Sequence, residues 1–417
     1  MHDSEYEFVY SGDEYFEKMW NMIDNSKICC WIITYHMKKS FIADETLRRL
    51  TKAAERGVNV VLYVDWLNYY LDNDLVKKLQ KAGGKVEWLN SMNLIFRSMS
   101  NMAIFSKHIF KRHHEKISLI DNTVIIGSAN FDIEYGETKY GNNRFFDLNL
   151  FVQNRCINSS QDFFFDVAKT YGFKLTRQDI PEYEDEDLNI VVSEPVVFRH
   201  DIQELLLQKI NQAQKRIIIA QGYYFHIKKI HKALKRAVER GVQIELITTK
   251  ERDQAVYKNL VNSKLAKRFL EIGGKVSEMT NKIFHTKMYI IDDHLILGSF
   301  NNDKWSWSMN SEVVFSCSNK AITHRAFEII EKLKYNQTQE VKLSLTKRVK
   351  GFVTRFWSGF LRASEHLMNG KKNYKYFILN SYIDDSTNPV EERHALRMNR
   401  VVKNKINTSE LNMMIYY

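Results

Sequence analysis

The chain has 417 residues, enough for two or three domain-sized cores, and its content of 44% hydrophobic and 13% aromatic residues excludes an intrinsically disordered protein. Lysine and arginine outnumber aspartate and glutamate by 61 to 50, and the net charge of +11 favours anionic partners, either nucleic acid or an acidic membrane surface. The four cysteines lack metal-type spacing, so we expect free thiols, buried in the case of the adjacent Cys29 and Cys30.

The sequence near the N-terminus contains no segment long and apolar enough to predict a membrane-spanning helix. The uncharged run from Ile28 to Met37 is about half as long as the roughly 20 apolar residues that a spanning helix needs, and it predicts a core strand. The first residues, MHDSEYEFVYSGDEYFEK, are acidic and show neither a signal peptide nor an Arg-rich amphipathic presequence. We therefore expect a soluble or peripheral protein.

Segments far apart in the chain repeat one pattern. Residues 46–65, TLRRLTKAAERGVNVVLYVD, match residues 230–249, IHKALKRAVERGVQIELITT. Each predicts an amphipathic helix, a glycine turn and a β-branched strand. The pairs KAGGKVEWL and EIGGKVSEM, ISLID and MYIID, and TVIIGS and LILGS extend the match. This alternation predicts an α/β fold of two pseudo-repeated lobes, each a mixed β-sheet flanked by helices.

Both halves of the repeat contain the pattern His-x-Lys-x4-Asp. The first copy comprises His114, Lys116 and Asp121, and the second comprises His285, Lys287 and Asp292. A Gly-Ser-Ala-Asn coda follows at 127–130, and a Gly-Ser-Phe-Asn coda follows at 298–301. The two copies are offset by a constant 171 residues (285 − 114, 298 − 127 and 301 − 130). Two triplets in register indicate a duplicated half-site, and we expect one active site where the lobes meet.

The residue types in the triplets suit attack on a phosphodiester. That reaction needs a nucleophile at phosphorus, a proton for the leaving oxygen and positive charge against the phosphate. Histidine can fill either of the first two roles because its pKa lies near neutrality, and a lysine two residues further along a strand projects from the same face. Because the two lysines supply positive charge, we expect no metal and no other cofactor. The two aspartates follow apolar runs, so we expect them to fix turns rather than to react.

Six further side chains are expected to support the reaction. The codas offer amides and hydroxyls for phosphate oxygens, at Ser128, Asn130, Ser299 and Asn301. A catalytic imidazole also needs an acceptor on its second nitrogen. The candidates are Asp147 and Glu312, each at the start of a strand that follows its motif.

The paired motif with its codas resembles the phospholipase D superfamily from about residue 13 to residue 334, and within it the bacterial-type cardiolipin synthases. Further similarity lies in the Arg-Gly-Val tripeptides at 56–58 and 240–242 and in the second coda, GSFNNDKWSWSMNSE. The family commonly has arginine where this chain has Trp305, and it commonly has Arg-x-His-Arg-Lys in the first motif, where Glu115 replaces the second arginine. These two departures leave both triplets intact.

The resemblance implies a two-step reaction through a phosphohistidine, with His114 as nucleophile and His285 as acid and base; the symmetry of the repeat does not itself distinguish the two. The leading interpretation is a phosphatidyltransferase of the cardiolipin synthase type, acting on an anionic phospholipid such as phosphatidylglycerol. The alternatives are a phospholipase that hydrolyses the phosphodiester, a nuclease of the same superfamily, and a membrane-binding module with a degenerate site. Retention of all six triplet residues argues against the last.

The predicted organisation has five parts. They are a first lobe at 6–172, an acidic linker at 173–190, a second lobe at 191–335, a basic amphipathic helix at 341–368 and a polar tail at 369–417. Between its paired glycines and its motif the first lobe has about 19 residues more than the second, and this insert, at about 90–110, mixes methionine and phenylalanine with basic residues. It could form a lipid-facing lid or an ordinary packed loop.

The insert at 90–110 and the residues 345–368 concentrate aromatic, apolar and basic side chains, which is the composition expected at an anionic membrane interface. This favours peripheral membrane association over nucleic-acid binding. The alternative for 345–368 is a C-terminal helix packed on the second lobe. In a bacterium we expect the cytoplasmic face of the inner membrane, and in a eukaryote the mitochondrion. The sequence leaves the oligomeric state open.

Overall fold

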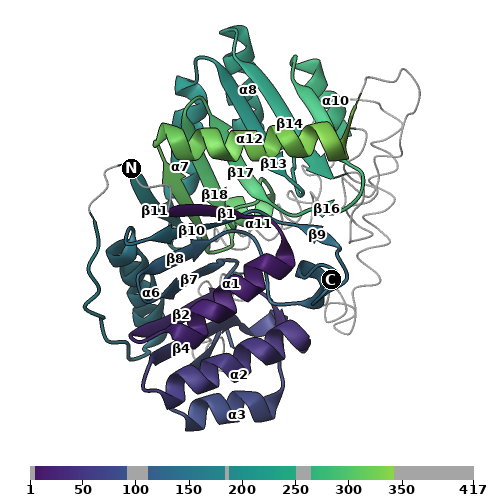
Figure 1. Ribbon diagram of the computed structural model, residues 1–417. Coiled ribbons are helices and arrows are strands. Elements are labelled where there is room, and N and C mark those ends of the chain that lie inside the picture. The colour runs from purple at the N-terminus through teal and green to yellow at the C-terminus, as the bar shows by residue number, and fades with distance from the viewer. Residues whose placement is uncertain (1–4, 92–110, 184–186, 250–263, 342–417) are drawn as a thin grey trace, which may run out of the picture.

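The computed structural model describes residues 5–91, 111–183, 187–249 and 264–341 (Figure 1). The predicted insert at 90–110, except for its first two residues, lies outside these ranges. The predicted helix at 341–368, except for its first residue, and the polar tail at 369–417 also lie outside them. None of the helices within the described ranges is long and apolar enough to cross a bilayer.

The first sheet has seven strands. In order across the sheet they are β1 (Tyr6–Val9), β10 (Asn149–Gln153), β8 (Thr123–Ile126), β7 (Ile117–Ile120), β2 (Cys29–Thr34), β4 (Asn59–Asp65) and β6 (Lys85–Leu89). Strands β2, β4 and β6 are parallel and the other pairings are antiparallel. Helices α1 (Gly12–Asn25), α2 (Phe41–Glu55) and α3 (Asn73–Lys81) pack on one face, and α6 (Ile157–Tyr171) packs on the other.

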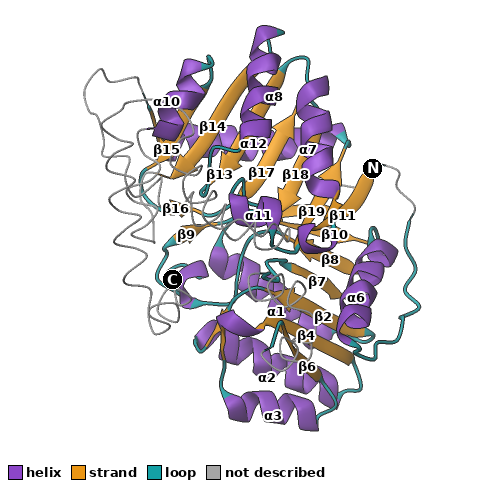
Figure 2. Cartoon of the chain, turned by 180° about the vertical axis from the view of Figure 1, so that it is seen from behind, coloured by secondary structure: helices purple, strands orange, loops and turns teal. Residues whose placement is uncertain are grey.

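The second sheet repeats this order and adds a strand at each edge. Its strands are β12 (Arg199–His200), β11 (Leu188–Glu194), β19 (Glu312–Cys317), β18 (His294–Gly298), β17 (Lys287–Ile291), β13 (Arg216–Gln221), β14 (Gln243–Thr249), β15 (Lys275–Met279) and β20 (Thr338–Glu340). Helices α7 (Asp201–Gln212), α8 (Lys228–Glu239) and α10 (Lys264–Glu271) cover the face seen in Figure 2, and α12 (Lys320–Gln337) covers the other. The predicted α/β class of two pseudo-repeated lobes with mixed sheets is confirmed.

The repeated helix–turn–strand segments fold as their sequences predict. Helix α2 and strand β4 are joined through Gly57, and α8 and β14 are joined through Gly241, which have φ angles of +89° and +91°. A side chain is disfavoured in this left-handed region, which accounts for glycine at both turns. The adjacent Cys29 and Cys30 are buried free thiols in the central strand β2, as predicted.

The two lobes are joined by a shared core and by main-chain pairing. One apolar cluster contains residues of both sheets together with α6 and α12. Two short strands, β9 (Phe145–Phe146) and β16 (Ile283–Phe284), pair in parallel across the interface. The His114 N–H donates to the Ser311 carbonyl and the His285 N–H donates to the Phe146 carbonyl, both at 2.9 Å. Main-chain bonds therefore hold each motif against the opposite lobe.

The remaining short elements lie in the connections. They are the strand pair β3 (Met37–Lys38) and β5 (Tyr69–Tyr70), the helix α11 (Lys304–Ser308) and the 3-10 turns η1 (Trp66–Asn68), η2 (Ile133–Tyr135) and η3 (Pro195–Val197). Turn η2 follows the first coda and α11 follows the second, so each coda leads into a single turn of helix.

Asp121 and Asp292 tie each motif strand to its neighbour. The Asp121 carboxylate accepts three main-chain N–H bonds of 2.8–3.0 Å from residues 27–29, where β2 starts. The Asp292 carboxylate accepts three of the same lengths from residues 214–216, where β13 starts. Both residues have positive φ angles, 47° and 51°, which aspartate tolerates better than most residues. The aspartates therefore fix turns, and they lie at the opposite strand ends from the histidines.

Asp292→Asn is expected to lower the free energy of unfolding by about 1–3 kcal/mol at pH 7, because the amide has one acceptor oxygen and no charge for the three N–H donors. Burial opposes ionisation of Asp292, but these donors outweigh it and hold its pKa below the ordinary value. The carboxylate's contribution is therefore present above about pH 4 and is lost as pH falls through the folded-state pKa.

Urea unfolding of wild type and variant at pH 7 and pH 3 measures both effects. Asp293→Asn is the matched control, since its half-exposed carboxylate lies at the surface 3.8 Å from Lys320 Nζ. Equal stability of wild type and Asp292→Asn at pH 7 would contradict the anchoring role.

Candidate active site

Each histidine of the paired motif is held by a carboxylate of the other lobe. Nδ1 of His114 lies 3.0 Å from both carboxylate oxygens of Glu312. Nδ1 of His285 lies 3.0 Å from Oδ2 of Asp147. All four side chains are buried. The two predicted acceptors thus contact the histidines, and each does so across the lobe interface, so the site is complete only when both lobes are present.

The carboxylate contacts also select which ring nitrogen can react. Burial raises the pKa of Glu312 to about 8, while the charge of Lys116 and the hydroxyls of Ser299 and Ser306 oppose this shift and favour the carboxylate. An ionised carboxylate accepts a hydrogen bond from Nδ1, which leaves Nε2 as the basic nitrogen of each neutral imidazole. Nε2 is the atom that can attack phosphorus or exchange a proton with an alcohol.

Glu312 has more hydrogen-bond donors than Asp147. The hydroxyls of Ser299 and Ser306 each donate to Glu312 at 2.5 Å, in addition to the His114 contact. The second oxygen of Asp147, Oδ1, is buried and has no hydrogen-bond partner within the described residues. The two half-sites therefore share one plan but differ in how firmly the carboxylate is held.

The lysines lie beside the histidines that precede them. Lys116 Nζ donates to the His114 carbonyl at 2.8 Å, and Lys287 Nζ donates to the His285 carbonyl. Both lysines are buried, and their ammonium groups lie 5.1 Å from the ring centre of Tyr35 and 5.7 Å from that of Tyr223, respectively. Within the described ranges, no group of three or more His, Cys, Asp or Glu side chains could hold a metal ion.

The coda serines support the interface. Ser128 Oγ donates to the Gly298 carbonyl and accepts from the Lys287 N–H, both at 3.3 Å, so it links the two half-sites. Ser299 holds Glu312 and also accepts from the Val313 N–H at 3.0 Å. A Cβ atom at Gly298 would lie 2.4 Å from the Val313 carbonyl oxygen, so the close approach of β18 and β19 requires glycine at this position.

The coda amides lie in the interior of the site. Asn130 and Asn301 are both buried. Nδ2 of Asn130 donates to the Tyr135 hydroxyl at 2.6 Å. The Oδ1 atoms of both asparagines are buried without a hydrogen-bond partner among the described residues. Each amide therefore keeps hydrogen-bonding capacity for a bound group.

Aromatic residues that the motifs did not predict surround the histidines. The ring centre of Tyr35 lies 4.7 Å from that of His114, while Tyr135 and Phe145 lie 5.3 and 5.2 Å from that of His285. The Tyr135 hydroxyl lies 3.4 Å from Nε2 of His285. The repeat itself contained a signal for Tyr135, because this residue stands 171 positions before Ser306 (306 − 135) in the coda.

Burial and the two lysine charges lower the pKa values of both histidines, so the imidazoles are neutral bases. The positive charge of the lysines favours binding of an anion. Burial, followed by the charge of Lys287, lowers the pKa of His285 to about 4, and burial followed by both lysines holds the pKa of His114 well below its ordinary value. Burial also lowers the pKa of Lys116 to about 8 and of Lys287 to about 7. Each lysine thus affects the histidine of the other lobe, and the four groups form one electrostatic unit.

The first departure from the family motif, Glu115, contacts His113 and not the two catalytic histidines. Glu115 is buried and its carboxylate oxygens lie 3.2 Å from Nδ1 of His113, whose Nε2 lies 2.5 Å from the Tyr171 hydroxyl. Burial opposes its charge, but the neighbouring His113 and further hydrogen bonds lower the pKa of Glu115 to about 2. His113 contacts Glu115 and Tyr171, whereas His114 contacts Glu312. The missing arginine is therefore replaced by a separate, internally paired network.

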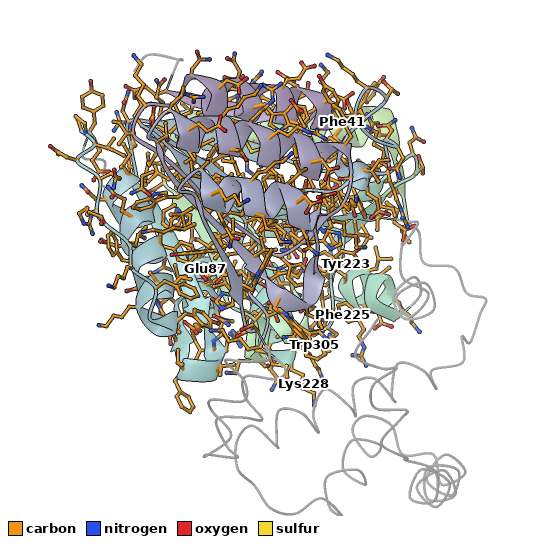
Figure 3. The ribbon with its side chains drawn as sticks, turned by 90° about the horizontal axis from the view of Figure 1, so that it is seen from below. Phe41, Glu87, Tyr223, Phe225, Lys228 and Trp305 are labelled. Atoms are coloured by element: carbon orange, nitrogen blue, oxygen red, sulfur yellow. The ribbon has the colours of Figure 1, made fainter. Side chains whose placement is uncertain are left out.

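The second departure, Trp305, lies at the rim of the site. Trp305 is half-buried in α11, and the loop after β13 is bonded to the residues just before α11 through the Phe225 N–H and the Asn302 carbonyl at 2.8 Å. Figure 3 shows Trp305, Phe225 and Tyr223 together with Lys228 on one side of the molecule. Where the family commonly has a cation, this chain has an aromatic residue.

Comparison with known proteins agrees with this geometry. The family model described as cardiolipin synthase, phospholipase D-like domain, matches residues 19–162 and 206–334, more than half of the chain. The chain belongs to this family. The two matched segments contain the two motifs of the phospholipase D-like site, one in each lobe.

Its relatives match over most of their length. The minor cardiolipin synthase ClsB of Bacillus subtilis is 25% identical over 334 residues, which cover 79% of this chain and 81% of that protein. Cardiolipin synthase B of Escherichia coli is 25% identical over 319 residues, which cover 73% and 74%. Among solved structures, phosphatidylserine synthase of Haemophilus influenzae aligns with a TM-score of 0.63 at 13% identity, over 88% of this chain and 96% of that one. This structural likeness shows a shared fold.

Glu312→Gln is expected to lower kcat for phosphodiester turnover by about 10²–10⁴-fold, because the amide no longer stabilises a charged His114 ring and can hold the wrong tautomer. Turnover of bis(p-nitrophenyl) phosphate by the purified variant measures this, with Glu328→Gln on the surface of α12 as the control. A variant with wild-type kcat would show that the cross-lobe contact has no part in the reaction.

The value of kcat/KM is expected to fall as pH rises through about 7–8, because a neutral lysine attracts the anionic phosphodiester less than a charged one. The folded-state pKa values of about 7 for Lys287 and about 8 for Lys116 set this range. In Lys287→Arg the fall should begin at higher pH, since arginine stays charged. If kcat/KM of Lys287→Arg falls over the same pH range as that of the wild type, the fall does not come from loss of the Lys287 charge.

Proposed function

We propose that this chain is a phosphatidyltransferase of the cardiolipin synthase type, which moves a phosphatidyl group between alcohols through a phosphohistidine. One observation carries the proposal: two imidazoles in a single buried site, each oriented by a carboxylate of the opposite lobe and each accompanied by a lysine. The named relatives support the choice of a phosphatidylglycerol-like substrate, since those of Bacillus subtilis and Escherichia coli are cardiolipin synthases.

In the first step, neutral Nε2 of His114 attacks phosphorus. The phosphorus–oxygen bond to the leaving glycerol breaks, and its electron pair remains on the glycerol oxygen, which takes a proton from His285. The phosphate charge raises the pKa of His285 when substrate binds, so the proton is available where it is needed. Glu312 stabilises the positive His114 ring that forms the phosphohistidine.

In the second step, the hydroxyl of the acceptor lipid attacks the phosphohistidine. His285, now neutral, takes the hydroxyl proton, and the phosphorus–nitrogen bond breaks with its electron pair returning to His114. Lys116 and Lys287 neutralise the charge on the phosphate oxygens in both steps. Asn130 and Asn301 can bond the bound phosphate group or hydroxyl from the walls of the site.

We also propose that the protein associates peripherally with an anionic membrane through residues 345–368 and the insert at 90–110, on the cytoplasmic face of the inner membrane in a bacterium. The support is their sequence composition, which combines basic and aromatic residues. A phospholipid substrate requires this proximity, because its acyl chains remain in the bilayer.

Hydrolysis to phosphatidic acid and nuclease activity are the alternative functions, since the same chemistry serves both. A nuclease would line its groove with basic residues that follow the phosphate backbone and with aromatic residues on which bases stack. Here Trp305 stands at the rim where the family commonly has arginine, with Phe225 and Tyr223 nearby (Figure 3). The concentration of aromatic, apolar and basic side chains in the insert at 90–110 and in residues 345–368 favours a lipid over a nucleic acid.

Purified protein incubated with phosphatidylglycerol vesicles is expected to form cardiolipin and free glycerol, whereas His114→Ala and His285→Ala should each lose at least about 10³-fold in activity. Lipid products are separated by thin-layer chromatography and mass spectrometry. If the phosphatidyl group of the substrate is radiolabelled, an acid-labile label should become attached to the wild-type protein and not to His114→Ala. This result would identify the phosphohistidine.

The products distinguish the alternatives. Phosphatidic acid without cardiolipin would assign a phospholipase, and cleavage of labelled single-stranded DNA or RNA without lipid turnover would assign a nuclease. Either result overturns the transferase proposal.

A further inference from the structure

Tyr135 and Ser306 occupy equivalent positions in the two halves of the repeat. Each stands five residues after its coda asparagine, Asn130 or Asn301, and the offset between them is 171 residues, the same as between the motifs (306 − 135). The repeat therefore places a hydroxyl at the same point of both half-sites, but on side chains of different length.

The two hydroxyls have different partners. The Ser306 hydroxyl donates to Glu312, the carboxylate that orients His114. At the equivalent carboxylate, Asp147, the buried Oδ1 has no hydrogen-bond partner within the described residues. The hydroxyl that supports a carboxylate in the second half of the repeat thus has different contacts in the first half.

The Tyr135 hydroxyl instead lies between a coda amide and the reactive nitrogen of a histidine. It accepts a hydrogen bond from Asn130 Nδ2 at 2.6 Å and lies 3.4 Å from His285 Nε2. The ring is buried and packs against His285 and Phe145, with centroid distances of 5.3 and 4.8 Å. Because the amide donates to the phenol oxygen, the phenol proton is directed to another acceptor, and Nε2 is the nearby basic atom.

We propose that Tyr135 is a further catalytic residue, whose hydroxyl relays the proton between His285 and the alcohol oxygen in both steps; the proposal rests on the phosphotransfer chemistry described above. A direct transfer would require the alcohol to occupy the place on Nε2 that this hydroxyl holds. With the relay, the alcohol oxygen contacts the phenol while Asn130 keeps the phenol oxygen in position.

The relay conserves protons. When the bond to the leaving alcohol breaks, the phenol proton moves to the alcohol oxygen and the Nε2 proton of His285 moves to the phenol oxygen. When the acceptor alcohol attacks, its proton moves to the phenol oxygen and the phenol proton moves to Nε2. Tyr135 is a neutral phenol before and after each step, and His285 alternates between its charged and neutral forms.

Tyr135→Phe tests the relay because it removes the hydroxyl and keeps the ring packing. Cleavage is followed in single turnovers with enzyme in excess, using two soluble diesters. Glycerophosphoglycerol has a leaving alcohol that must be protonated, whereas bis(p-nitrophenyl) phosphate releases a phenolate that can depart unprotonated. We expect glycerol release to slow by about 10–100-fold, part of the effect that a positioned proton donor supplies, and the p-nitrophenolate burst to stay within about twofold of wild type.

Tyr140→Phe is the matched control, because its hydroxyl bonds Glu17 at the surface of the same lobe, and it should leave both rates unchanged. Equal slowing with both diesters would show that Tyr135 only positions His285, and unchanged rates with both would show that the hydroxyl has no role. Either result overturns the relay. Cleavage of these diesters by a wild type that does not convert phosphatidylglycerol would refute the lipid function alone.

Discussion

The structure depends on two crossed pairs of buried ionisable side chains, His114 with Glu312 and His285 with Asp147. Removing such groups from water costs several kcal/mol each unless they are paired and hydrogen-bonded. Here each partner is supplied by the opposite lobe, so a lobe alone would leave a histidine and a carboxylate buried without each other. The interface is therefore restricted to one register, and the main-chain bonds at Ser311 and Phe146 hold it.

The duplication makes the two half-sites similar, and local substitutions make the surroundings of the two histidines different. Glu312 receives two serine hydroxyls and a histidine, whereas Asp147 holds its histidine with one oxygen. A firmly held carboxylate suits a ring that must carry charge in a covalent intermediate. A less constrained one suits a ring that gains and loses a proton in each step. Environments that differ around two similar groups are how a site assigns distinct acid–base roles, and the contacts favour His114 as the nucleophile.

Much of this arrangement was predictable from the sequence, because the repeat encodes it locally. A constant offset predicted the two lobes, and the spacing of His114 and Lys116 along the chain predicted that they share one site. The pairing of His114 with Glu312 was not predictable, since 198 residues separate them and strand periodicity says nothing about how two lobes dock. Tyr135 was not predicted, for a related reason: the repeat identifies residues that match between the copies, whereas this one matters because it differs from its counterpart.

Burial of the reactive groups bears on the choice between transfer and hydrolysis. The four triplet side chains that react or bind phosphate, His114, Lys116, His285 and Lys287, are between 2% and 8% exposed. A phosphohistidine formed among them meets little bulk water, and exclusion of water is what prevents hydrolysis of a reactive intermediate. An acceptor hydroxyl that binds beside the histidines would displace the remaining water. Such burial favours transfer to a bound alcohol over hydrolysis, because the acceptor that occupies the site also keeps water out.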